Sequence, residues 1–167
     1  GREMVGLATD LGACAIMIGS TNGPHLNSFS LVDTASHGRA CGILNPYYAV
    51  LFAAAVERQL MALGRVLAAH GMIAEDLEGL SGRDLALAVA EGMQRFLQSL
   101  GAPISLRELQ GFSTDHLERM LTAAKDPQLR MKLENMPIPI PPHKIDSAIG
   151  SVLEAVAAGD LRLVQTL

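Results

Sequence analysis

The sequence predicts an all-α domain. Apolar residues recur at helical spacing in several long stretches, and glycine and proline residues separate these stretches, as they do between helices. The sequence contains no alternation of strand and helix patterns, no glycine fingerprint after a strand and no internal repeat. With 167 residues, the chain is expected to form a single domain, residues 1–167, long enough to bury a core.

The first predicted helix covers residues 2–18. Gly6, Gly12 and Gly19 weaken it, and in a packed domain such glycines often allow the close approach of a neighbouring backbone. Asp10 is expected to be a solvated or capping carboxylate. The apolar residues at helical spacing are Met4, Val5, Leu7, Ala8, Leu11, Cys14, Ala15 and Ile18.

A long helix is predicted from Asn45 to His70. Its apolar residues fill more than one stripe, which is typical of a helix buried on several sides. We interpret His70, which precedes Gly71, as the C-terminal residue of a helix that stops at glycine, where a partial positive charge suits the helix dipole.

The second half of the sequence predicts several shorter helices. His116 falls in the first turn of one of them and is expected to be exposed, and His143 lies among prolines and is given no functional role. Residues 137–142 must be extended, because each proline fixes φ and removes a donor. The predicted elements are a helix from Ser81 to Leu100 with a capping-box-like Asp84, a turn at Ser105 and Glu108, and helices from Asp115 to Lys125, Gln128 to Asn135 and His143 to Ala158.

Two histidines, His25 and His37, lie between these helices in a run of small and polar residues. On one straight helix they would be about 18 Å apart and turned by about 120°, so they could not share an ion. Two imidazoles on one ion, each about 2.1 Å from it, have their nitrogens within about 4 Å of one another. The chain would therefore have to turn back between them. Asp33 and its polar neighbours supply turn and N-cap chemistry for this reversal.

Several sequence blocks resemble the C-terminal domain of the iron-containing (group III) alcohol dehydrogenases. In that family a glycine-rich helix ends in a ligand histidine, and a second ligand histidine opens the segment H-G-x-x-x-x-I-L-x-P. The corresponding blocks here are GREMVGLATDLGACAIMIGSTNGPH, which ends at His25, and HGRACGILNP, which begins at His37. The later blocks MQRFLQSLGAPISLRELQGFS and NMPIPIPPHKIDSAIGSVLEAVAAGD are similar to the family's following helices and closing proline segment, so nearly the whole chain is covered.

The resemblance implies a helical bundle of the dehydroquinate synthase-like fold, with His25 and His37 as metal ligands. It also implies that the intact protein interconverts an alcohol and an aldehyde or ketone by hydride transfer, with NAD(P) and a divalent metal, iron(II) or zinc. Family members begin with a nucleotide-binding α/β domain and carry an Asp and a His four residues apart that complete the metal shell, and neither feature is present in this sequence. We therefore expect the fragment alone to be inactive and to hold no metal tightly. The missing N-terminal domain and the small-molecule substrate are its expected partners, and a homodimer is compatible with the sequence.

One position departs from the family pattern. Family members commonly carry another histidine one turn after the first ligand, and Phe29 stands at that position here. The interval to His37 is also two residues shorter than usual. Both departures bear on the proton relay and the substrate pocket, and they suggest a divergent branch with its own substrate.

The composition excludes some classes of partner. A net charge of −4 and a pI near 5.7 leave no basic surface for nucleic acid or an anionic membrane. Hydrophobic residues make up 49% of the chain, but the longest apolar run, Ala49 to Val56, is far shorter than the about 20 residues that span a bilayer. We therefore expect apolar surface that another domain or subunit covers. Two cysteines and a charged start without a signal peptide are consistent with a cytoplasmic protein.

Two other functions fit the sequence. A non-catalytic helical interaction or regulatory module would have the same high apolar content and would also lack nucleotide motifs, and an independent metal-binding helical protein would have the same histidine pair. The enzyme interpretation requires both imidazoles to face one open surface that solvent reaches. The module interpretation places no constraint on them.

Overall fold

The computed structural model describes residues 1–167 and contains only helices. The predicted all-α class is confirmed. Five 3₁₀ turns connect the longer elements, at Phe29–Leu31, Leu106–Glu108, Pro127–Leu129, Pro142–Lys144 and Leu161–Leu163. The α-helices are α1 (Arg2–Gly19), α2 (Gly23–Ser28), α3 (His37–Leu51), α4 (Glu57–Ala69), α5 (Gly82–Ser99), α6 (Thr114–Lys125), α7 (Arg130–Glu134) and α8 (Ile145–Ala158).

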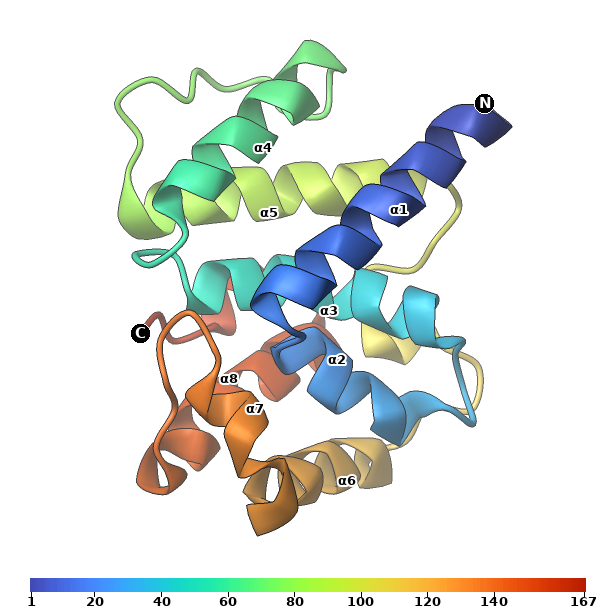
Figure 1. The fold of residues 1–167 in the computed structure, drawn as a ribbon, viewed down its shortest axis with the longest axis vertical. Coiled ribbons are helices and arrows are strands. Elements are labelled where there is room, and N and C mark those ends of the chain that lie inside the picture. The colour runs from blue at the N-terminus through green and yellow to red at the C-terminus, as the bar shows by residue number, and fades with distance from the viewer.

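Helix α3 lies at the centre of the molecule (Figure 1). It contacts α5 on one side and α2 and α8 on the other, while α4 packs on α5 and α6 packs on α2 and α8. Apolar side chains from all these helices form one continuous core of 36 buried residues, in which Tyr47 and Leu51 of α3 are fully enclosed. The domain is therefore organised around α3, and this helix begins at His37.

Helix α1, which crosses in front of α3 and α5 in the view of Figure 1, makes no extensive contact with the other helices. The predicted helix is present, but none of its residues is buried, and the side chains of Met17 and Ile18 are 86% and 90% exposed. A Cβ added at Gly6 or Gly12 would meet no atom within 4 Å, so these glycines bring no neighbouring backbone close. Asp10 is exposed, as predicted.

No single helix has both the length and the apolar character needed to cross a membrane. The segment formed by α1 and residues 23–31 reaches that length and composition only as a pair, and it is bent by 105° at the break between its two parts.

The predicted long helix from Asn45 to His70 is wrong, because the chain forms two helices, α3 and α4, in its place. Between them, the backbone N–H of Ala53 bonds to Val50 O and that of Ala55 to Phe52 O, which are the shorter i→i−3 bonds of turns. Phe52 and Ala53 are buried at this break. The reversal lets α4 fold back onto α5, so tertiary packing overrides the helix-favouring local sequence.

The predicted capping box is present at Ser105 and absent at Ser81. Ser105 and Glu108 form a capping box, in which Glu108 Oε1 accepts from the Ser105 backbone N–H at 2.9 Å. Helix α5 begins after Ser81 as predicted, but the Ser81 side chain makes no capping bond. Glu57 takes this role from another helix, because its Oε2 accepts from the backbone N–H of Gly82 at 2.6 Å.

The predicted exposure of His116 is wrong. This residue of α6 is only 5% exposed, and its Nδ1 accepts the backbone N–H of Ser113 at 3.1 Å. The ring lies against Phe112 at a centroid distance of 5.5 Å. Downstream, the helix predicted from Gln128 is a 3₁₀ turn followed by the short α7, and the last helix, α8, ends before Gly159, which has the expected left-handed conformation.

Candidate metal centre

The structure brings the imidazoles of His25 and His37 together. Nδ1 of His25 lies 3.2 Å from Nε2 of His37, and the two rings are nearly perpendicular, with an angle of 88° between their planes. His25 belongs to α2, His37 opens α3, and the segment 29–36 reverses the chain between them. The close approach that the sequence would require for a shared ion is therefore present. That these residues bind a metal stays a prediction.

The packing of α2 on α3 fixes the first of the two histidines. The ring of Tyr48 occupies the space beside Gly23, so that a methyl group at residue 23 would overlap the ring. The Tyr48 hydroxyl donates to Asn27 Oδ1, and Asn27 Nδ2 donates to the carbonyl of Met120 in α6 at 3.4 Å. Burial raises the pKa of Tyr48, so this hydroxyl remains a donor at all physiological pH values. Helix α2, which carries His25, is thus held by both α3 and α6.

Ser28 determines which nitrogen of His37 faces His25. Its hydroxyl donates to the carbonyl of His25 at 2.8 Å, so its oxygen accepts the N–H of His37 Nδ1 at 2.9 Å. The unprotonated nitrogen of His37 is then Nε2, and its lone pair is directed at Nδ1 of His25. The pair can either share one proton in a hydrogen bond or direct two lone pairs at a cation.

The spacing of the two nitrogens suits a shared ion. For ligand distances of about 2.1 Å, two nitrogens lie about 3.0 Å apart at a right angle and about 3.4 Å apart at the tetrahedral angle. The 3.2 Å separation of His25 Nδ1 and His37 Nε2 falls between these values. The donor set thus fits two cis ligands of one divalent metal ion.

The surroundings favour neutral imidazole, which is the form that binds metals. Partial burial lowers the pKa of His25, and its electrostatic interactions with Lys132 and His37 lower it further. His37 is exposed and His25 is half-buried, so solvent reaches both residues. The enzyme interpretation requires such access, and it stays a prediction.

Phe29 forms an apolar wall beside the histidine pair. Its ring meets the His25 ring edge-on at a centroid distance of 4.8 Å and stacks on the His37 ring at 5.7 Å. The side chain is 55% exposed. The site therefore presents at this position a phenyl ring that can neither accept nor donate a proton.

Cys41 is a neighbour that the sequence analysis did not predict. Its Sγ lies 3.7 Å from Nε2 of His37, one helical turn further along α3, and the i, i+4 spacing was the signal that could have identified it. Burial raises the pKa of the Cys41 thiol, which favours the protonated form over the thiolate that binds metals. No group of three or more His, Cys, Asp or Glu side chains is arranged to hold a metal ion.

The other candidate residues lie away from this pair. Asp33 faces α6, where it accepts from Arg119 Nη2 at 2.9 Å, which agrees with its interpretation as a turn residue and not as a ligand. His70 is the C-terminal cap of α4, as predicted, and is followed by Gly71 with positive φ. His143 is exposed in a 3₁₀ turn.

Comparison of the chain with protein-family models, with curated proteins and with solved structures finds no match. The resemblance to iron-containing alcohol dehydrogenases therefore depends on the sequence blocks around His25 and His37 and on the order of the later blocks.

Proposed function

We propose that this chain is the helical, metal-binding half of an NAD(P)-dependent alcohol dehydrogenase of the iron-containing type. The observation that carries the proposal is the 3.2 Å separation of His25 Nδ1 and His37 Nε2 on a surface open to solvent. A bound divalent ion would supply Lewis-acid chemistry at the oxygen of an alcohol, whose hydride the nicotinamide would accept.

The residues of this chain would hold and orient such an ion but would not enclose it. Ser28 keeps the lone pair of His37 Nε2 directed at the site, and the lowered pKa of His25 keeps its imidazole neutral. Two neutral ligands leave the positive charge of the ion uncompensated. The remaining ligands, including a carboxylate, would come from the missing half of the enzyme.

Uncovered apolar surface supports a partner that covers this domain. Helix α1 exposes its apolar residues along its whole length, and it ends at Gly19, six residues before His25. A partner that packs along α1 would therefore reach the histidine pair. Such large exposed apolar surfaces usually mark interaction sites.

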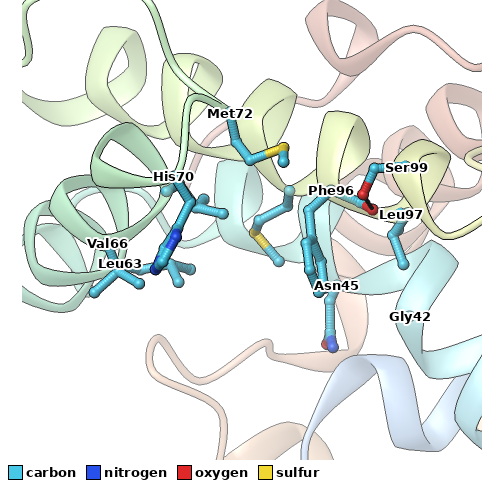
Figure 2. A pocket seen from close by; sticks show the side chains of 11 residues that line it. Gly42, Asn45, Leu63, Val66, His70, Met72, Phe96, Leu97 and Ser99 are labelled. Carbon is cyan, nitrogen blue, oxygen red and sulfur yellow. Dashed lines mark hydrogen bonds between the residues drawn. The ribbon is translucent and has the colours of Figure 1, made fainter. Parts of the chain in front are cut away.

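A second apolar surface lies between α3, α4 and α5. A pocket of about 710 Å³ is lined there by residues that include Leu63 and Val66 of α4 and Phe96 and Leu97 of α5. Figure 2 shows these side chains around it. Leu63, Val66 and Phe96 are all exposed at its rim. An interaction module without catalytic activity would have the same surfaces, and it is therefore the second candidate function. It differs from the enzyme in making no use of the histidine pair.

Titration of the chain with Co²⁺ distinguishes the two functions. We expect binding weaker than micromolar, because only two protein ligands are present, and we expect its loss in His25→Ala and in His37→Ala. His143→Ala is the matched control, because this exposed histidine lies away from the pair, and it should bind like the wild type. Binding that survives both substitutions, or no binding at all, would contradict the proposed site. Micromolar binding would instead indicate an independent metal-binding protein.

The dehydrogenase part of the proposal has its own test. We expect the reading frame upstream of Arg2 to encode a nucleotide-binding α/β domain, followed by an Asp and a His four residues apart. A reading frame with neither would contradict a dehydrogenase while leaving metal binding by the histidine pair open to measurement.

A further inference from the structure

The start of α3, which carries His37, is weakly held by its own residues. Ser36 occupies the N-cap position but makes no side-chain capping bond, and the first turn contains no acidic residue. His37, Gly38 and Arg39 are all exposed. Uncapped and exposed first turns are where helices fray. The orientation of the His37 ring therefore depends on what fixes the turn that precedes it.

Helix α6 holds this turn through Asp33. Nη2 of Arg119 donates to both carboxylate oxygens of Asp33, at 2.9 and 3.2 Å. His116 lies on the same carboxylate, with its Nε2 3.4 Å from Asp33 Oδ1. Since Nδ1 of His116 accepts a backbone N–H from Ser113, its proton is on Nε2 and faces Asp33. This nitrogen is buried and makes no hydrogen bond, so its approach to Asp33 is a contact only.

The same helix also holds α2, which carries the other histidine. The carbonyl of Met120 in α6 accepts from Asn27 of α2, and the Met120 side chain is fully buried in the core. Helix α6 thus contacts both segments that bring the histidines together: α2 through Asn27, and the turn before α3 through Asp33. This helix therefore contributes to the relative placement of His25 and His37, together with Ser28 and the packing of α2 on α3.

We propose that Asp33 is a positioning residue for the histidine pair, because its hydrogen bonds to Arg119 and its contact with His116 anchor the turn that aims Nε2 of His37 at His25. The Arg119 guanidinium holds the pKa of Asp33 below its usual range, so the carboxylate stays charged in neutral solution. The role in orientation stands on the geometry of the metal-free protein. Only its consequence for metal affinity rests on the proposed function.

The test compares Asp33→Asn with Glu78→Gln. Glu78 is the matched control because it forms an exposed ion pair of similar length, 3.0 Å to Arg65, in a part of the chain that does not touch the histidines. Two readouts are needed: the imidazole ¹⁵N shifts of His37 in the metal-free protein, and the Kd for Co²⁺. We expect Asp33→Asn to shift the His37 resonances and to weaken Co²⁺ binding by about 10-fold, as the loss of outer-shell support does at metal sites. Arg119→Gln should act in the same direction, and Glu78→Gln should change neither readout.

The outcomes separate the two proposals. If Asp33→Asn lowers Tm but leaves the His37 resonances unchanged, Asp33 is a structural tether only and the inference is overturned. If the resonances shift while the wild type binds no Co²⁺, Asp33 positions His37 and the metal-binding proposal fails. A shift in Asp33→Asn that Asp33→Glu reverses supports the positioning role, because the glutamate restores the charge facing Arg119.

Discussion

Ser28 shows how one hydroxyl can determine the chemistry of an imidazole pair. Because it donates to the His25 carbonyl, it can only accept from His37 Nδ1, and this leaves His37 Nε2 as the nitrogen with the free lone pair. The residue is almost completely buried, so water does not compete for these bonds. Without the hydroxyl, His37 could adopt either tautomer and its ring could rotate.

Ser28→Ala should therefore affect metal binding more than stability. We expect Co²⁺ binding to weaken by about 10-fold, as for other outer-shell partners of ligand histidines, while unfolding free energy falls by only about 1 kcal/mol. Isothermal titration and denaturant unfolding measure the two effects. Ser151→Ala is the control, since this buried serine of α8 also donates to a carbonyl, that of Ala148, but lies in another part of the fold. Equal Co²⁺ affinity in Ser28→Ala and wild type would contradict the role given to Ser28.

Asp33 also predicts a pH dependence. Two groups face it, Arg119 and His116, and the Arg119 guanidinium lowers its pKa in the folded protein. A carboxylate with a lowered folded-state pKa adds stability above its unfolded pKa, and this stability is lost as pH falls through the folded value. The difference in Tm between wild type and Asp33→Asn should thus be larger at pH 6 than at a pH well below the usual pKa of an aspartate, where the Asp33 carboxylate becomes protonated. A difference that does not change with pH would show that the ion pair does not stabilise the fold.

At the scale of elements, the sequence predicts periodic helices better than the contacts between them. The apolar spacing of residues 2–18, the Ser105–Glu108 box and the stop at Gly159 are local patterns, and all three are present in the structure. The helix break after Leu51 contains no glycine or proline that would mark it in the sequence. It results from the packing of α4 back onto α5, which is a tertiary contact. His116 likewise lies beside Asp33, which is distant in sequence, and the sequence pattern does not show this contact.

In the candidate site, too, the sequence predicts local features but not the contacts between distant residues. The sequence identifies His25 and His37 and requires a reversal between them, but it contains no information about which ring atoms meet. That detail depends on Ser28 and on the packing of Tyr48 against Gly23, which only the folded chain brings together. Cys41 could have been found from its spacing to His37, whereas the anchoring of Asp33 on α6 could not.

Gly23 tests whether the contact between α2 and α3 positions His25. A methyl group in Gly23→Ala would overlap the Tyr48 ring, so we expect a loss of about 1–3 kcal/mol from overpacking and a weaker Co²⁺ affinity as α2 moves away. Gly150→Ala in α8 is the control, because a Cβ there meets no atom within 4 Å, and it should stabilise the protein by about 0.5–1 kcal/mol. Both values come from denaturant unfolding. If Gly23→Ala changed neither the unfolding free energy nor the Co²⁺ affinity, the contact between α2 and α3 would not position His25.

At the scale of the whole molecule, the apolar surface is divided between a core around α3 and an uncovered face. The core contains the fully buried Leu44 and Tyr47, whereas α1 contributes no buried residue. An exposed helix of this length is only marginally stable by itself in water. Its sequence is therefore suited to burial against a partner, as the proposed second half of the enzyme would provide.

Substitution of Leu11 tests whether the apolar residues of α1 contribute to the stability of this domain. Because Leu11 is 61% exposed and α1 contains no buried residue, Leu11→Gln should change the unfolding free energy by less than about 0.5 kcal/mol. The matched substitution Leu44→Gln removes a fully buried leucine and inserts a polar group, and it should cost at least about 2–5 kcal/mol. A large loss in Leu11→Gln would mean that α1 packs on its own domain and needs no partner.

The most direct measurement is the anomalous diffraction of crystals soaked in excess Co²⁺. We predict one ion that binds both Nδ1 of His25 and Nε2 of His37, with water at its remaining positions and with Cys41 outside its shell. An ion bound to only one of the two rings, or no ion between rings whose nitrogens remain 3.2 Å apart, would contradict the account.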